Sequence, residues 1–497
     1  MKKIVLTSFS ILLLLIVSCT EEDNGVPQSL EVNDFVWKGL NHVYFWQANV
    51  SNLADSRFKN QDELNLFLNT YSEPEDLFES LLFDTQNVDR FSWIVDDYVA
   101  LEQQFQGVSM SNGVEFKLKQ IEGTNDVLGY VRYILPNSDA STKNIERGDI
   151  FLTVDGQQLT LNNYRHLLFS DNNNSYTLGL AVLTNDIFTL TGETVALTKE
   201  VYTENPVFIT KSFDISGNKI GYLMYNAFTS NFDHQLNEAF AQLKAEGVKD
   251  LVLDLRYNGG GSVRTAIYLA SMISGQFNGK LFARERWNEK LQQAIENENP
   301  SRLVNNFTNE MLHTDSNGNI LLQEPINSLN LTKLYVLITG NSASASELII
   351  NGLNPYIDVN LIGTKTFGKY VASVTLYDSE NFGRSGANSN HTYAMQPIVL
   401  EELNNLGVNN KDGFVPHIAI EDDFLNFGIL GNQEEPLLQK ALEAITNNTS
   451  ISTTSKKMTT LQFRDLESSK SYLPFYNEMY VENTLILNTI QFSNANR

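Results

Sequence analysis

Two residues in the second half of the chain have the types and the spacing of a serine–lysine pair. Ser344 lies in the run Asn-Ser-Ala-Ser-Ala-Ser-Glu at 341–347, and Lys369 follows it 25 residues later. A serine hydroxyl is a weak nucleophile until a neighbouring base takes its proton, and a lysine serves as that base only when burial lowers its pKa. Lys369 stands close to Phe367 and Tyr370, which suit such an apolar setting. The residues alone are also compatible with an ordinary turn of small residues and a solvated lysine.

The elements around Ser344 place it on a turn from a strand to a helix. Residues 333–339 form an uninterrupted apolar run rich in β-branched side chains, which predicts a buried strand. The residues after the serine run predict a helix with Ser346 as its N-cap. The free amides and the positive dipole end at the start of a helix favour negative charge that develops there. The next apolar run, 359–363, predicts a neighbouring strand whose following loop carries Lys369.

A run of glycines follows a second predicted strand. Residues 251–256 have the sequence Leu-Val-Leu-Asp-Leu-Arg, and Asn-Gly-Gly-Gly occupies positions 258–261. Glycines let backbone N–H groups approach a ligand closely, in conformations that other residues avoid. A phosphate-binding loop is excluded because no Gly-Lys-Ser or Gly-Lys-Thr follows. A plain tight turn remains the alternative to an anion-binding pocket of backbone amides.

Together these motifs resemble the active-site blocks of the tail-specific, or C-terminal processing, serine peptidases. In that family a Ser-Ala-Ser-Glu turn precedes a Thr-Phe-Gly-Lys-Gly loop, and Asp-Leu-Arg-x-Asn-Gly-Gly-Gly is a further hallmark. Here Ser344, Glu347, Thr366 and Lys369 fall on the matching positions. The resemblance implies a serine endopeptidase that hydrolyses peptide bonds of protein substrates near their C-termini. Ser344 would be the nucleophile and neutral Lys369 its base.

The resemblance also implies an oxyanion hole. In the family one of the glycine amides pairs with the amide after the nucleophile, which here corresponds to Ala345 together with Gly259 or Gly260. Such donors stabilise the negative oxygen that forms when the scissile carbonyl is attacked. The resemblance implies no cofactor, and the six scattered histidines form no pair with metal-ligand spacing.

Two positions depart from the family pattern. Tyr370 stands where the family often has glycine, and Ser373 stands where many members have a glutamine that orients the lysine. A serine hydroxyl is still able to accept a hydrogen bond from Lys369, so Ser373 is our candidate for the third catalytic member. The departure leaves open a non-catalytic peptide- or ligand-binding lipoprotein on the same fold. A purely structural lipoprotein would not require both the glycine run and the serine–lysine pair.

The pattern of elements predicts a multi-domain α/β protein. Residues 28–104 predict an N-terminal helical domain, and residues 105–203 contain short β-type runs. Strands alternate with helical patterns over 206–445, and the resemblance implies that this region is a crotonase-like ββα peptidase domain. A linker and C-terminal tail, 446–497, follow, with no evident docking place.

The β-rich region resembles a PDZ domain. The signature lies in Ile-Glu-Arg-Gly-Asp-Ile at 145–150 and Val-Asp-Gly at 154–156, where Asp155-Gly156 predicts a type I′ hairpin. A PDZ groove binds a peptide as an added strand, and its backbone amides capture the peptide's C-terminal carboxylate. The expected carboxylate loop near 111–116 is a poor match, because Glu115 lies close to where the anion would bind.

The start of the chain predicts a lipoprotein signal peptide. Lys2 and Lys3 precede the apolar run 4–16, and Ile-Val-Ser-Cys ends it at Cys19, the only cysteine of the chain. This resembles a bacterial lipobox, which implies residues 1–18 as signal peptide, lipidation at Cys19 and a tether over 19–27. A plain secretory signal or a membrane-spanning helix is the alternative, although the apolar run is short for a span. The expected location is the cell envelope, as an outer-membrane-anchored lipoprotein facing the periplasm or the cell surface.

The composition narrows the class of partner. The chain of 497 residues carries 35 basic and 59 acidic residues, a formal net charge of −24. A phosphate backbone would be repelled rather than neutralised by this charge, which argues against a nucleic-acid partner. The expected partners are protein or peptide substrates, and the membrane through the lipid at Cys19.

Overall fold

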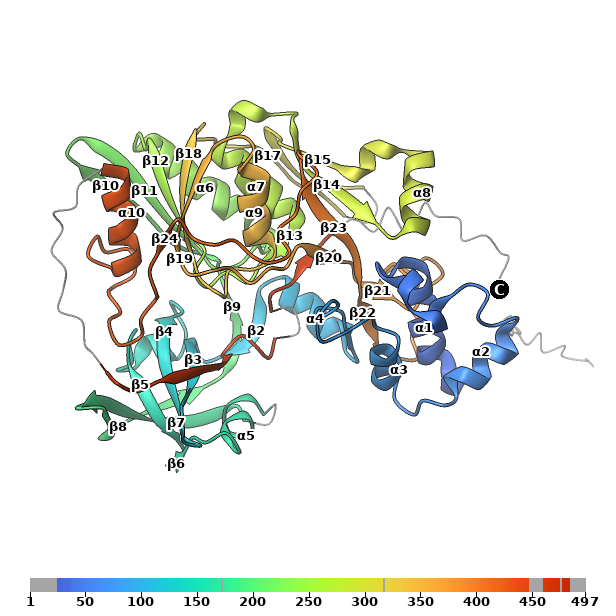
Figure 1. Cartoon of the computed structure of the whole chain (residues 1–497), viewed down its shortest axis with the longest axis horizontal. Coiled ribbons are helices and arrows are strands. Elements are labelled where there is room, and N and C mark those ends of the chain that lie inside the picture. The colour runs from blue at the N-terminus through green and yellow to red at the C-terminus, as the bar shows by residue number, and fades with distance from the viewer. Residues whose placement is uncertain (1–24, 171–172, 316–317, 447–458, 474–475, 483–497) are drawn as a thin grey trace, which may run out of the picture.

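The computed structural model describes residues 25–170, 173–315, 318–446, 459–473 and 476–482 (Figure 1). The predicted signal peptide and Cys19 lie outside the described residues. A helical N-terminal region, a β-rich unit and an α/β unit follow one another along the chain, which confirms the predicted multi-domain α/β class. Within these ranges, no helix has the length and apolar character needed to cross a bilayer.

Three helices begin the described chain: α1 (Glu31–Val43), α2 (Gln61–Leu68) and α3 (Pro74–Ser80). Asn60 caps α2 by accepting a hydrogen bond from the amide of Glu63, and Pro74 opens α3, where a missing N–H is tolerated. β1 (Trp93–Val95) and α4 (Tyr98–Phe105) follow. β1 pairs with β22 (Ala394–Gln396), which ties the helical region to the α/β unit.

The β-rich unit is built on a sheet with strand order β25-β3-β4-β5-β7-β8. Its elements are β3 (Val114–Ile121), β4 (Val127–Ile134), β5 (Ile150–Val154), β6 (Gln157–Gln158), α5 (Tyr164–Phe169), β7 (Ser175–Thr184), β8 (Ile187–Thr198) and β25 (Phe463–Ser468). Asp155 and Gly156 have φ angles of 50° and 75°, the positive values that a type I′ turn requires, so the predicted hairpin is confirmed. A separate pair, β2 (Val108–Ser111) with β9 (Glu200–Thr203), connects this unit to the rest.

The main sheet of the α/β unit has the order β10-β11-β12-β18-β19-β24. Its strands are β10 (Val207–Ile215), β11 (Asn218–Tyr225), β12 (Asp250–Asp254), β18 (Lys333–Ile338), β19 (Asp358–Gly363) and β24 (Ile418–Ala419), parallel from β11 onward. Successive residues of a strand face opposite sides, so Leu251 and Leu253 join the core beneath α6 (Asp233–Ala245), α7 (Val263–Ile273) and α9 (Ala345–Leu353). Val252 joins a second core beneath α10 (Pro436–Thr446). Helices thus cover both faces of the parallel sheet (Figure 1).

A second sheet of the α/β unit has the order β13-β26-β20-β23-β14-β15. Its strands are β13 (Gly261–Ser262), β26 (Met479–Tyr480), β20 (Val371–Ser373), β23 (Ile398–Asn404), β14 (Leu281–Trp287) and β15 (Val304–Asn306). The remaining elements are α8 (Glu289–Glu298), the hairpin β16 (Glu310–Thr314) and β17 (Ile320–Pro325), and β21 (Leu376–Tyr377). β26 belongs to the C-terminal tail, so the tail supplies an inner strand beside the glycine run.

Candidate active site

Ser344 occupies the turn between β18 and α9. It has φ 65° and ψ −118°, a conformation that residues other than glycine rarely adopt and that costs free energy. The side chain is fully buried, and its Oγ has no hydrogen-bond partner among the described residues. A strained serine with an uncommitted hydroxyl at the start of a helix has the features of a nucleophile.

The predicted N-cap of this helix is wrong by two residues. Ser344 itself holds the N-cap position of α9, and Ser346 lies in the first turn. The Oγ of Ser346 donates to the carbonyl oxygen of Asn258 at 3.0 Å, so this serine fastens the nucleophile turn to the glycine run. The Ala343 amide donates to the same carbonyl at 3.2 Å.

The backbone of the glycine run lies against the turn that carries Ser344. A Cβ at Gly260 would lie 2.6 Å from the Cβ of Ser344 and 3.0 Å from the nitrogen of Ala345, and the φ of Gly260 is 117°. Only glycine fits there, for both space and conformation. The amide of Ala345 is the first of α9 and has no acceptor within the helix, as an oxyanion donor requires. The amide of Gly260 donates to Asn258 Oδ1 at 2.9 Å and would have to leave that acceptor to serve an oxyanion.

Glu347 joins the nucleophile turn to the lysine loop. Its carboxylate accepts hydrogen bonds from the amides of Ser344 (3.0 Å), Gly368 (2.8 Å) and Lys369 (2.8 Å). Burial raises the pKa of Glu347, and these donors, together with the hydroxyl of Thr366, act in the opposite direction. One buried carboxylate therefore fixes the backbones of both candidate catalytic residues, a role that the sequence motif does not reveal.

Lys369 is fully buried. Its Nζ lies 2.8 Å from Glu478 Oε2 and 4.8 Å from the ring centroid of Phe91. Burial lowers the pKa of Lys369 because the charged form loses its hydration, while the nearby Glu478 carboxylate acts to raise it. The net direction is downward, which favours the neutral amine that a base requires.

Ser344 and Lys369 line one small cavity. The other lining residues are Glu347, Leu348, Asn351, Tyr370, Glu402, Asn410, Phe414 and Met479. No hydrogen bond joins the Ser344 hydroxyl to the lysine amine within the described part of the chain. Catalytic hydrogen bonds are often long in the absence of substrate. The two side chains therefore share one cavity without a direct hydrogen bond between them.

Among the hydrogen bonds of the described residues, none joins Ser373 to Lys369, the contact expected from the sequence. Its Oγ lies 3.4 Å from Glu478 Oε2 and 3.3 Å from the carbonyl oxygen of Met479. Because β26 lies next to β20, the carboxylate of Glu478 lies beside the lysine amine. The residue that contacts Lys369 was missed because it lies more than a hundred positions away, in a tail with no recognisable motif.

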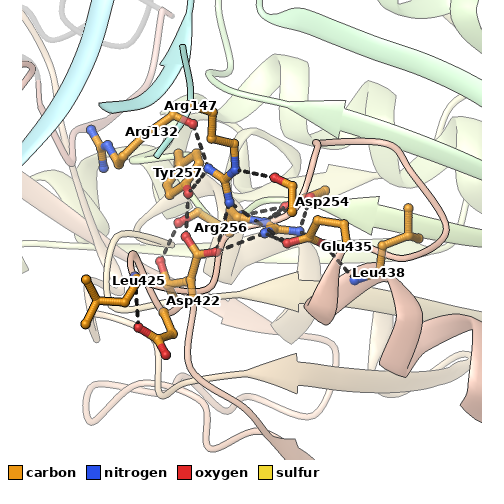
Figure 2. A network of polar contacts seen from close by, with 12 residues as sticks. Arg132, Arg147, Asp254, Arg256, Tyr257, Asp422, Leu425, Glu435 and Leu438 are labelled. Carbon is orange, nitrogen blue, oxygen red and sulfur yellow. Dashed lines mark hydrogen bonds and ion pairs between the residues drawn. The ribbon is translucent and has the colours of Figure 1, made fainter. Parts of the chain in front are cut away.

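Figure 2 shows a network of polar and ionic contacts around Arg256. The guanidinium of Arg256, fully buried, contacts the carboxylates of Asp254, Asp422 and Glu435. Arg147, from the β-rich unit, donates to Tyr257 Oη at 2.7 Å and pairs with Asp422 at 3.1 Å. The network fixes the end of β12, from which the glycine run departs.

Comparison with known proteins agrees with this geometry. A model of peptidase family S41 matches residues 219–385, and a model of the peptidase S41 N-terminal domain matches residues 31–93. A carboxyl-terminal-processing protease of Picosynechococcus sp. is 24% identical over 321 residues, which cover 64% of this chain and 66% of that protein. One from Synechocystis sp. is 21% identical, over 87% of this chain and 88% of the relative. A solved structure from Bacteroides fragilis assigned to the S41 proteases shares the fold, with a TM-score of 0.61, 24% identity, and coverage of 83% of this chain and 97% of that one.

Proposed function

The chain belongs to peptidase family S41 and is a serine-type peptidase acting on proteins, and on that premise we propose that Ser344 and Lys369 form its catalytic dyad. The observation that carries the proposal is the shared cavity: a strained serine with a free hydroxyl and a fully buried lysine line it together. A non-catalytic binding protein would not need a lysine held out of water beside that serine.

The proposed reaction follows serine-peptidase chemistry. Neutral Lys369 takes the proton of Ser344 Oγ, which attacks the scissile carbonyl carbon and forms an acyl-enzyme after the amine leaves with that proton. Water, deprotonated by the same lysine, then releases the acyl group. The amides of Ala345 and of Gly259 or Gly260 hold the oxyanion, an effect worth about 3 kcal/mol for each donor.

We further propose cleavage near the C-termini of substrates, with the β-rich unit acting as a PDZ-like module. The relatives named above are carboxyl-terminal-processing proteases, and in the β-rich unit a strand, β25, lies between β3 and α5 as a bound peptide lies in a PDZ groove. The test is to incubate the protein with an unfolded protein and with peptides that carry either a free or an amidated C-terminus. Faster cleavage of the free form supports the proposal, and no hydrolysis of any of them would favour the binding protein.

The pH dependence of kcat tests the role of Lys369. The base acts only when neutral, and burial lowers its pKa below the ordinary value. We therefore expect kcat to rise with pH, with a slope of about one in log kcat, and to level off at a pH below the ordinary lysine pKa of about 10.4. A profile measured from about pH 6 to 10 that is flat, or that falls as pH rises, would contradict a lysine base.

Anchoring to the outer membrane through a lipid on Cys19 is a separate proposal, supported by the lipobox-like sequence alone. Cys19→Ser is expected to move the protein out of the membrane fraction or to stop its maturation. The measurement is fractionation together with incorporation of labelled fatty acid. Labelled fatty acid on the serine variant would contradict this site of lipidation.

A further inference from the structure

The two last described stretches of the chain lie in the two places where a peptide substrate would bind. The first, 463–472, runs along the β-rich unit, and the second, 476–482, runs through the active site. Residues 463–468 of the first stretch and 479–480 of the second are strands that pair with neighbouring strands, and residues 469–472 and 476–477 form turns.

The first stretch is an added strand between β3 and α5. β25 pairs antiparallel with β3, for example Asp465 with Lys119 (dark red strand beside β3 in Figure 1). On its other side, Glu467 accepts hydrogen bonds from Tyr164 and Arg165 of α5. The ring of Tyr472 stacks on that of Phe169 of α5 with centroids 3.9 Å apart. An extended segment held by a strand on one side and a helix on the other is the mode in which a PDZ-like groove takes a peptide.

The second stretch is an added strand between the glycine run and β20. Met479 lies opposite Gly261 of β13, and Tyr480 lies opposite Ser373 of β20. The amide of Val481 donates to the carbonyl of Ser373 at 3.0 Å. Main-chain hydrogen bonds of this kind do not depend on side-chain identity, so the backbone of a substrate peptide is able to pair with the same strands.

The same stretch covers the groups that would receive the scissile bond. A Cβ at Gly260 would lie 2.6 Å from the carbonyl oxygen of Glu478, and one at Gly259 would lie 3.0 Å from the amide nitrogen of Asn477. The tail therefore lies directly against the proposed oxyanion glycines. A second, larger pocket lies beside it, and Tyr476 and Tyr480 help to line this pocket together with the glycine run.

Met479 lines the small cavity of Ser344 and Lys369, and Tyr480 lines the large one. This part of the tail therefore separates the cavity of the dyad from the larger pocket, and both proposed catalytic side chains are completely buried. A peptide that lies in the larger pocket is separated from Ser344 by this part of the tail.

Glu478 restrains the proton transfer from Ser344 to Lys369, in addition to the steric block by the tail. A carboxylate 2.8 Å from the lysine amine stabilises the ammonium form, and the ammonium form cannot take a proton from serine. Burial has the larger influence and lowers the pKa of Lys369, and the Glu478 carboxylate acts against it.

We propose that the stretches 463–472 and 476–482 are an intramolecular ligand that occupies both peptide grooves and restrains the peptidase until a substrate displaces it. The active-site half of this inference rests on the proposed function. The alternative is that β26 is a permanent part of the site and that Glu478 positions Lys369 for catalysis. The two alternatives predict opposite effects of weakening the tail.

The test uses two full-length variants. Glu478→Gln keeps the shape of the side chain and removes the charge beside Lys369. Met479→Ala removes side-chain volume at a position that is 1% exposed and adds no charge to the cavity of Ser344 and Lys369. We expect each to raise kcat/KM for an unfolded protein, and the rate at which a serine-directed phosphonylating probe labels Ser344, by about tenfold, equivalent to weakening the tail by about 1.4 kcal/mol. The matched control is Glu289→Gln on the exposed surface of α8, which should change neither rate. Loss of both activities in both variants would overturn the proposal and identify β26 as part of the catalytic machinery.

A second measurement does not depend on activity. In the full-length Ser344→Ala protein, the amide hydrogen of Val481 should exchange slowly with deuterium, and Met479→Ala should accelerate its exchange toward the rate of a free peptide. A saturating unfolded protein should do the same. Protection that persists with saturating unfolded protein contradicts displacement. If no variant hydrolyses any substrate while the exchange results hold, then the peptidase proposal fails and the proposal of an intramolecular ligand stands.

Discussion

Replacing Ser344 with alanine, or Lys369 with methionine, is expected to reduce kcat by about 10⁴-fold or more. The double variant should be no slower than either single variant, because the nucleophile and its base act as one unit. Lys369→Met preserves most of the buried packing, and the Glu478 carboxyl that loses its partner is able to take up a proton because burial raises its pKa. The measurement is steady-state cleavage of an unfolded protein, with circular dichroism to check the fold.

The neighbouring serines provide matched controls. Ser342 Oγ donates to the carbonyl of Leu255 at 2.8 Å, and Ser346 Oγ donates to that of Asn258, so both hydroxyls are committed to the turn. Ser342→Ala and Ser346→Ala should lose about 1–3 kcal/mol of stability, from the buried acceptors left unpaired, and should retain measurable turnover. If either alanine abolished cleavage while Ser344→Ala did not, the nucleophile would be assigned to the wrong serine.

Replacing Arg256 with methionine is expected to lower the free energy of unfolding by about 3–5 kcal/mol. The guanidinium neutralises the fully buried Asp254 and the buried Glu435. Methionine would remove this countercharge and leave only Arg147, whose guanidinium lies 3.9 Å from Glu435. Urea denaturation followed by fluorescence measures the loss. Activity should fall as well, because the glycine run begins where this network holds the end of β12.

The control for this change is Arg284→Met, at an exposed position on β14, which should alter stability by no more than about 0.5 kcal/mol. Arg256→Lys should fall between the two, because a lysine keeps the charge but not the two-pronged contact with Glu435. Equal stability of Arg256→Met and Arg284→Met would show that the network does not support the fold.

The parts of the site that the sequence predicted are local. The serine turn, the glycine run and the Asp155-Gly156 hairpin depend on a few adjacent residues and on conformations that only certain residue types adopt. The buried strands β12 and β18 were also predicted from adjacent residues, because each is a short run of apolar side chains. The N-cap of α9 was misplaced because two serines near it are both good capping residues, and only the backbone angles decide between them.

The parts that the sequence could not predict depend on contacts between distant segments. Glu478 is one of 59 acidic residues, and nothing near it in the sequence links it to Lys369. Glu435 likewise belongs to a polar stretch before α10, yet it is buried against Arg256. Charges are normally placed at the surface, so the burial of such a group is decided by a partner that the linear sequence does not identify.

Because the tail is part of the same chain as the peptidase, it affects which proteins are able to reach the two grooves. A tethered competitor is present at an effective concentration on the order of millimolar, and dilution of the enzyme does not reduce it. A short peptide that fits one groove displaces only one stretch of the tail. The other stretch stays bound and keeps the displaced one close to its groove, so the short peptide competes poorly. A long unfolded chain that contacts β3 and the glycine run at once gains avidity from both, so the tail selects substrates by length and by lack of structure rather than by sequence.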